Sequence, residues 1–174
     1  AMVTSINSDL ANGIGNLLSR TLTMIERFAG GKIPASGSPA LAELEEKIAA
    51  TAAKLPDTLE RGFVSLAFRD NLQAIWELVG LCDEYIDKSA PWTLAKKPED
   101  APKLNTVLNT ATRALRLLSV LMYPYMPQIS VQALTQLGLT FDFSKPVPAE
   151  SYAWETSLVG AKIQKGTGLF PRVI

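Results

Sequence analysis

Apolar residues recur every three or four positions through the first segment of the chain, and this spacing is the strongest constraint on its fold. The recurring residues are Ile6, Leu10, Ile14, Leu17, Met24, Ile25 and Phe28. Gly30 and Gly31 then supply a left-handed stop, and Pro34 keeps the following loop extended. The pattern predicts a long amphipathic helix over residues 6–28.

The same spacing continues beyond this loop, and prolines divide it into further helices. We expect a second helix from Pro39 to the Leu55-Pro56 step, because a proline disfavours helical conformation in the residue before it. The pattern then resumes over residues 59–86 as one long helix or two consecutive helices, with a bend near 69–71. The apolar positions of this part are Leu59, Phe63, Leu66, Leu72, Ile75, Val79, Cys82 and Ile86.

Three more helices complete the expected bundle. Pro91 suits the first position of a brief helix, and a long helix is expected from about Leu104 to the next proline. A shorter helix starts at Pro127 and ends at Gly138. The chain is therefore predicted to be all-α, with a bundle of about five helices over residues 1–140.

Residues 141–174 have a different composition, with prolines and glycines scattered among short apolar pieces. We expect an extended C-terminal tail that packs back on the bundle within the same domain, with Phe170 as its anchor. A disordered end is the alternative.

The chain contains no histidine, which excludes the commonest catalytic triads and the usual imidazole ligands of zinc. Neighbouring carboxylates such as Glu45 and Glu46 point in different directions on a helix and form no convergent acid/base pair. The single cysteine, Cys82, falls on an apolar helical face and is expected in the core. We expect no catalytic residue and no metal site, and a helical hydrolase or transferase ranks last among our hypotheses.

Lys and Arg together number 17, as do Asp and Glu, so the overall charge does not attract a polyanion over long distances. The apolar stretches are too short to cross a bilayer, and the amino terminus lacks the order of a signal peptide. We expect a soluble, cytoplasmic fragment of a longer protein that contacts neither membrane nor DNA.

Three side chains are candidates for binding a nucleic acid base. Asn16 and Arg20 lie four positions apart on the polar stripe of the first helix, where an amide and a planar guanidinium suit the polar edge of a base. Trp92 follows Pro91 at a corner between helices, so its ring is well placed to stack on a base. The ordinary alternatives are a solvent-facing stripe and a tryptophan that fills a gap between helices.

Several segments of the chain resemble the anticodon-binding domain of methionyl-tRNA synthetases. The main ones are residues 7–21, which open the first helix, and residues 84–96, which read Glu-Tyr-Ile-Asp-Lys-Ser-Ala-Pro-Trp-Thr-Leu-Ala-Lys at the corner. Residues 74–78, 123–127 and 169–172 agree as well. The resemblance covers nearly the whole chain.

This resemblance implies a role in recognising the CAU anticodon loop of methionine tRNA. Trp92 would stack on the first anticodon base, a cytosine, while Asn16 and Arg20 would contact anticodon bases and Pro91 would set the position of the ring. The parent enzyme would join methionine to its tRNA, and ATP and any zinc would belong to its catalytic portion. That portion would be the second partner of this fragment, which lacks the ATP-binding signatures and is not expected to be active alone.

The chain departs from the family pattern at two places. Asp83 stands where an asparagine is expected, beside the corner, and residues 164–168 lack the usual proline. A helical protein-interaction module that no longer binds tRNA is the alternative function, and the balanced charge favours it.

Overall fold

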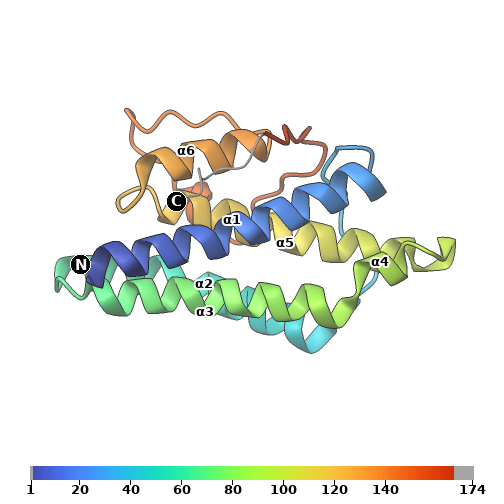
Figure 1. Cartoon of the computed structure of the whole chain (residues 1–174), viewed down its shortest axis with the longest axis horizontal. Helices are drawn as coiled ribbons and strands as arrows, with labels where there is room; N and C mark the ends of the chain where they lie inside the picture. The colour runs from blue at the N-terminus through green and yellow to red at the C-terminus, as the bar shows by residue number, and fades with distance from the viewer. Residues whose placement is uncertain (1, 167–174) are drawn as a thin grey trace.

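The computed structural model describes the backbone of residues 2–166 and the side chains from residue 8 onward within that range. Five longer helices form the bundle, and a short one makes a corner in it (Figure 1). Their bounds are α1 Met2–Phe28, α2 Ala42–Val64, α3 Phe68–Ser89, α4 Pro91–Leu94, α5 Ala101–Leu121 and α6 Pro127–Gln136. No strand occurs among the described residues, which confirms the predicted all-α bundle of about five helices.

Helix α5 is the centre of the bundle. It contacts α1, α2, α3 and α6, and almost every residue from Leu104 to Leu121 is buried. The apolar faces of the other helices pack around it, as the helical spacing of their apolar residues requires. The bundle is elongated, with the α4 corner at one end and the α2–α3 turn at the other (Figure 1).

Three glycines end helices in the way that the sequence predicts. Gly30 and Gly31 follow α1 with φ of 63° and 80°, and Gly138 follows α6 with φ of 85°. This left-handed conformation is easy for glycine because it has no Cβ atom. Gly138 also lies so close to the carbonyl of Lys162 that a Cβ atom would be 2.4 Å from its oxygen.

The second helix differs from its prediction at both ends. It begins at Ala42 rather than Pro39, and it continues through Pro56 instead of ending there. Leu55 and Leu59 are both buried, and their packing outweighs the single hydrogen bond that the proline removes.

The break between α2 and α3 falls at residues 65–67, not at 55–56 or 69–71. Leu66 adopts φ of 61° there and is 72% exposed, so its place in the apolar pattern was misleading. The turn contains no glycine or proline and gives no local signal. Asn71 stabilises it instead, since its side-chain Nδ2 donates to the carbonyl of Leu59 at 3.0 Å and to the hydroxyl of Tyr125 at 2.9 Å.

The described part of the tail is extended along the bundle, as predicted, apart from one 3₁₀ turn, Ala149–Tyr152. Lys32 and Lys162 form an isolated antiparallel bridge, and Trp154, Leu158 and Ile163 are buried. The predicted anchor, Phe170, lies outside the described residues.

Arg116 of α5 also holds the tail. It is almost completely buried, and its guanidinium donates to the carbonyls of Ser151 and Ala153. Burial, followed by the charge of Arg113, lowers the pKa of Arg116 to about 10, so it stays charged at neutral pH.

Candidate nucleic-acid interface

Helices α1 and α3 run side by side in the same direction, which sets the two polar candidates of α1 against the second half of α3 (Figure 1). Near the start of this contact, Gly13 packs under the ring of Trp76, where a Cβ atom would be 2.8 Å from two ring carbons. Asn16 follows one turn later and is exposed, and the side chain of Arg20 keeps 40% of its surface. Both are therefore available at the surface.

One carboxylate of α3 holds the guanidinium of Arg20, and a second lies near it. Its Nη2 donates to Oδ1 of Asp87 at 2.8 Å, and its Nη1 lies 3.8 Å from Oδ1 of Asp83. Asn16 and Ser19 join these three residues around a shallow depression of about 460 Å³. A planar donor group held at the rim of a shallow polar hollow is suited to bind the edge of an unpaired base.

Asp83 is the residue that departs from the family pattern, and the structure shows what it contacts. Burial raises the pKa of its carboxyl, Arg20 partly offsets this, and the negative charge of Asp87 raises it again. A carboxylate at this position therefore carries a cost that an asparagine would not.

The corner after α3 is made by Ala90 and Pro91. Ala90 takes a left-handed φ of 48° and caps both helices, since its amide donates to the carbonyl of Ile86 and its carbonyl accepts from Thr93 at 2.8 Å. Pro91 occupies the first position of α4 and is buried. Its fixed φ and its burial leave little freedom to the residue that follows.

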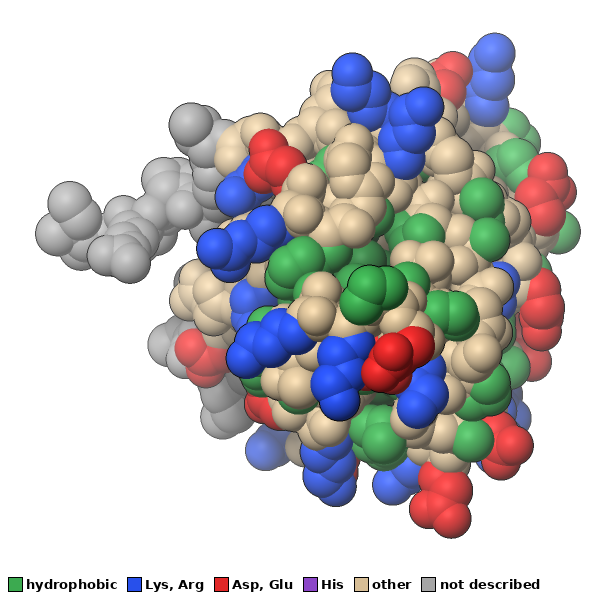
Figure 2. Space-filling view, turned by 90° about the vertical axis from the view of Figure 1, so that its right-hand side faces the viewer, with side chains coloured by type: hydrophobic (Ala, Val, Ile, Leu, Met, Phe, Trp, Pro, Cys, Tyr) green, Lys and Arg blue, Asp and Glu red, His purple; other side chains and the backbone are tan. Residues whose placement is uncertain are grey.

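That residue is Trp92, which is 47% exposed. Tryptophan is normally well buried, so a tryptophan with nearly half of its surface in solvent is unusual. Lys96 and Lys97, also exposed, follow four and five residues later. Figure 2 looks onto this end of the molecule and shows basic, acidic and apolar side chains interspersed across it. Aromatic rings among basic groups are typical of surfaces that bind single-stranded RNA.

The structure places Asn16 and Arg20 on one surface, where Arg20 contacts Asp87 of α3. Pro91 and Trp92 lie at the corner that follows α3. Asp87 and Ser19 were not singled out from the sequence. A contact between two helices leaves no local pattern, and only the phase of the two helices relative to each other could have revealed it.

The described residues offer no metal site and no reactive thiol. Among residues 2–166, no group of three His, Cys, Asp or Glu side chains is placed to hold a metal ion. Cys82 is buried in the core, and burial, followed by the charge of Asp83, raises the pKa of its thiol to about 12. Such a thiol is not a nucleophile at neutral pH. None of the described helices is long and apolar enough to cross a membrane.

Comparison with known proteins gives consistent matches. Residues 29–173 match the family model of the anticodon binding domain of methionyl tRNA ligase. The chain is 38% identical over 173 residues to a methionine–tRNA ligase of Caldanaerobacter subterraneus subsp. tengcongensis, and 40% identical over 171 residues to one of Deinococcus radiodurans. These alignments cover 99% and 98% of this chain but 26% and 24% of the relatives. The chain therefore spans about a quarter of their length.

Solved structures agree with this match. The apo form of Mycobacterium tuberculosis methionyl-tRNA synthetase superposes with a TM-score of 0.83 at 30% identity, covering 99% of this chain and 34% of that one. The complex of the same synthetase with methionyl-adenylate also gives 0.83, at 31% identity.

Proposed function

This chain belongs to the family of methionyl-tRNA ligase anticodon-binding domains, and from that premise we propose that it binds the CAU anticodon loop of methionine tRNA as part of a longer ligase. The resemblance seen in the sequence is thereby confirmed at the level of the family. Within the longer ligase, the catalytic portion would use ATP to join methionine to the tRNA. The domain described here would select the tRNA and carry out no chemical step.

The exposed ring of Trp92 on a rigid corner is the observation that carries this proposal. Sequence-specific proteins commonly read RNA loops by stacking unpaired bases on aromatic rings. A side chain on a backbone that is already ordered requires no ordering of that backbone when a base stacks on it. We propose that the ring of Trp92 stacks on the first anticodon base. Pro91 would set the position of the ring.

Asn16 and Arg20 supply the hydrogen bonds that stacking lacks. Stacking accepts any base, because every base has a π face. The amide of Asn16 both donates and accepts, and the guanidinium of Arg20 donates from two nitrogens held near Asp83 and Asp87. We assign to these two side chains the discrimination among bases rather than the bulk of the affinity.

The balanced overall charge is compatible with this role. Affinity that comes from stacking and base edges needs few phosphate contacts, and the exposed Lys96 and Lys97 lie in the segment that follows α4. We therefore expect binding with a shallow salt dependence.

Binding of the 174-residue chain to two anticodon stem-loops, one with CAU and one with GAU, tests the proposal at fixed salt. We expect the chain to prefer CAU and the variant Trp92→Ala to lose about tenfold to hundredfold in affinity together with the preference. Tyr152→Ala serves as the matched control, because it removes another exposed aromatic ring from a different face. Equal, salt-sensitive binding of both loops by the unmodified chain would contradict the proposal.

A further inference from the structure

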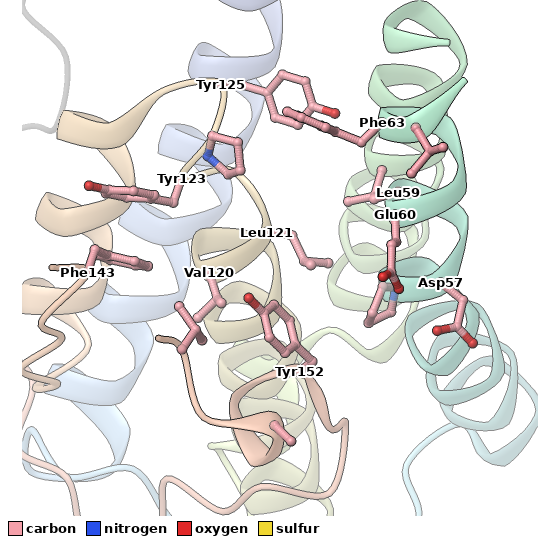
Figure 3. A pocket seen from close by; sticks show the side chains of 15 residues that line it. Asp57, Leu59, Glu60, Phe63, Val120, Leu121, Tyr123, Tyr125, Phe143 and Tyr152 are labelled. Atoms are coloured by element: carbon pink, nitrogen blue, oxygen red, sulfur yellow. The ribbon is translucent and has the colours of Figure 1, made fainter. Parts of the chain in front are cut away.

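The described tail borders two regions of opposite charge. Where it lies along α2, a groove of about 630 Å³ is lined by Asp57 and Glu60, and no Lys or Arg is among the lining side chains (Figure 3). Where the tail reaches the end of α1, it carries Lys162 and Lys165, which are both exposed. The first region repels the phosphates of RNA, whereas the second attracts them.

The basic region is built by backbone pairing between the tail and the loop after α1. Lys32 and Lys162 are opposite each other in the antiparallel bridge. On either side of them, the amides of Ile33 and Ile163 each donate to a carbonyl of the opposite segment, at 3.0 and 2.9 Å. Lys32 and Lys162 therefore form a non-hydrogen-bonded pair, the arrangement in which opposed side chains lie closest.

This pairing places two positive charges side by side. Side chains of directly opposed residues project from the same face, with Cβ atoms about 4.5–5.5 Å apart, and like charges in such a pair destabilise it. Lys32 and Lys162 are both exposed, and neither forms a salt bridge with a described residue. Lys165 differs, since it lies 3.7 Å from a carboxylate oxygen of Glu26. The lysine pair is thus suited to a negatively charged partner outside the chain.

The lysine pair lies at the same end of the bundle as the candidate interface. Figure 1 shows the C-terminal end of α1 and the α4 corner at this end, and Lys32 lies four residues beyond the last residue of α1. Arg27, in the last turn of α1, is exposed and lies on the same stripe as Arg20, about 10 Å further along the helix. Basic side chains therefore continue from Arg20 toward the lysine pair.

We propose that Lys32 and Lys162 bind backbone phosphates of the tRNA next to the anticodon. This inference rests on the proposed function, in which the anticodon bases lie at Arg20 and Trp92. The lysine pair supplies affinity that is independent of sequence, because phosphates carry no base information. Two phosphate contacts also keep the salt dependence of binding shallow, since each contact adds only about 0.7 to 0.9 to its slope.

The double variant Lys32→Gln/Lys162→Gln tests this site in the 174-residue chain. Glutamine is also long and polar but carries no charge. Affinity for the CAU and GAU stem-loops is measured over a range of salt concentrations. We expect the slope of log affinity against log salt to fall by about 0.7 to 0.9 per lysine, and the affinity to fall roughly fivefold per lysine at ~0.1 M salt. Both stem-loops should lose the same factor, so the preference for CAU is retained.

Two further measurements separate binding from a structural role. Removing two like charges from the bridge should leave the midpoint of thermal unfolding unchanged or raise it, so weaker binding would not come from a loosened tail. The variant Lys32→Arg/Lys162→Arg keeps both charges and should keep the affinity and the salt slope of the unmodified chain.

Lys54→Gln/Lys145→Gln is the matched control. It removes the same charge from two exposed lysines, one on α2 and one in the segment after α6. We expect its affinity and salt slope to equal those of the unmodified chain. An equal loss in this control would overturn the proposed site, because the effect would then follow from net charge alone.

Unchanged affinity and slope in Lys32→Gln/Lys162→Gln would also overturn the proposal. Failure of the proposed function has a different signature, which is equal binding of the CAU and GAU stem-loops by the unmodified chain. A smaller salt slope in the lysine variant would support the phosphate site in that case too, since phosphate binding does not depend on the loop sequence.

Discussion

The two ends of the bundle present opposite surfaces, although the same helices build both. At the α4 end, Trp92 is half-exposed at the corner after α3, and Arg20 is held at the surface by Asp87. At the α2–α3 end, aliphatic and aromatic side chains are exposed beside a groove with two acidic residues. The first surface suits unpaired bases and the second suits another protein surface.

The difference originates in how each connection is built. Ala90 and Pro91 make a tight corner through the left-handed φ of Ala90 and the buried ring of Pro91, and the next side chain, Trp92, is half-exposed. The α2–α3 turn depends on packing instead, with Gly62 making room for the buried amide of Asn71. The corner at Ala90 and Pro91 therefore exposes one aromatic side chain, Trp92. The α2–α3 turn exposes several apolar side chains together.

Gly62→Ala should have the largest effect on stability. The new Cβ atom would lie 1.9 Å from the Asn71 Oδ1 atom, and overpacking of this kind costs about 1–3 kcal/mol. The better helix propensity of alanine returns up to about 1 kcal/mol, so we expect a net loss of about 1–2 kcal/mol in chemical denaturation.

Gly80→Ala is the control for this change. Gly80 lies in α3, and a Cβ atom added there would have no heavy atom of a neighbouring element within 4 Å, so the same substitution should stabilise the chain by about 0.5–1 kcal/mol. Binding to the CAU stem-loop should remain unchanged in both variants. A shift in the same direction for both would show that the α2–α3 turn does not depend on this close approach.

These two connections also show how far the sequence predicts the structure. Gly30, Gly31 and Gly138 end helices where expected, because a left-handed glycine is a local signal. The turn at Leu66 was missed, because what holds it is Asn71, a residue of the next helix, in contact with Leu59 and Tyr125. Local chemistry could be predicted from the sequence, and contacts between helices could not.

The same limit applies to the candidate site. Asn16 and Arg20 were recognisable from their spacing, and Trp92 from the proline before it. The partner of Arg20, Asp87, depends on the register of α1 against α3, which the spacing within one helix does not determine. The assignment of these residues to anticodon bases remains a prediction.

Arg20→Lys tests whether the α4 end reads base edges or only attracts charge. Lysine keeps the positive charge near Asp87 but loses the planar fork of donors. We expect affinity for the CAU stem-loop to fall about threefold to tenfold, or about 1 kcal/mol, with the salt dependence of binding unchanged. Arg27→Lys, the same change at an exposed residue of α1, should have no effect. Equal affinities for all three proteins would assign Arg20 a purely electrostatic or structural role.

Asp83→Asn should give the smallest effect, and its sign depends on pH. In the folded chain the pKa of Asp83 is raised, chiefly by burial, above its ordinary value of 3.8. Between the ordinary and the raised pKa the folded state binds more protons than the unfolded state, so stability falls as pH increases through that window. At pH 7 the charged carboxylate therefore lowers the stability of the fold, and asparagine should remove this loss.

We expect Asp83→Asn to raise the free energy of unfolding at pH 7 by less than about 0.5 kcal/mol, since the side chain is 42% exposed and solvent screens its charge. Well below pH 3.8 the difference should vanish, because aspartic acid is then as neutral as asparagine. Asp87→Asn should act in the opposite direction at pH 7, because it weakens the 2.8 Å hydrogen bond from Arg20. Chemical denaturation of the unmodified chain and of both variants, at pH 7 and at acidic pH, measures these differences in the free energy of unfolding. A less stable Asp83→Asn at pH 7 would mean that attraction to Arg20 outweighs the cost of burial, and that this carboxylate helps to hold the guanidinium at the α4 end.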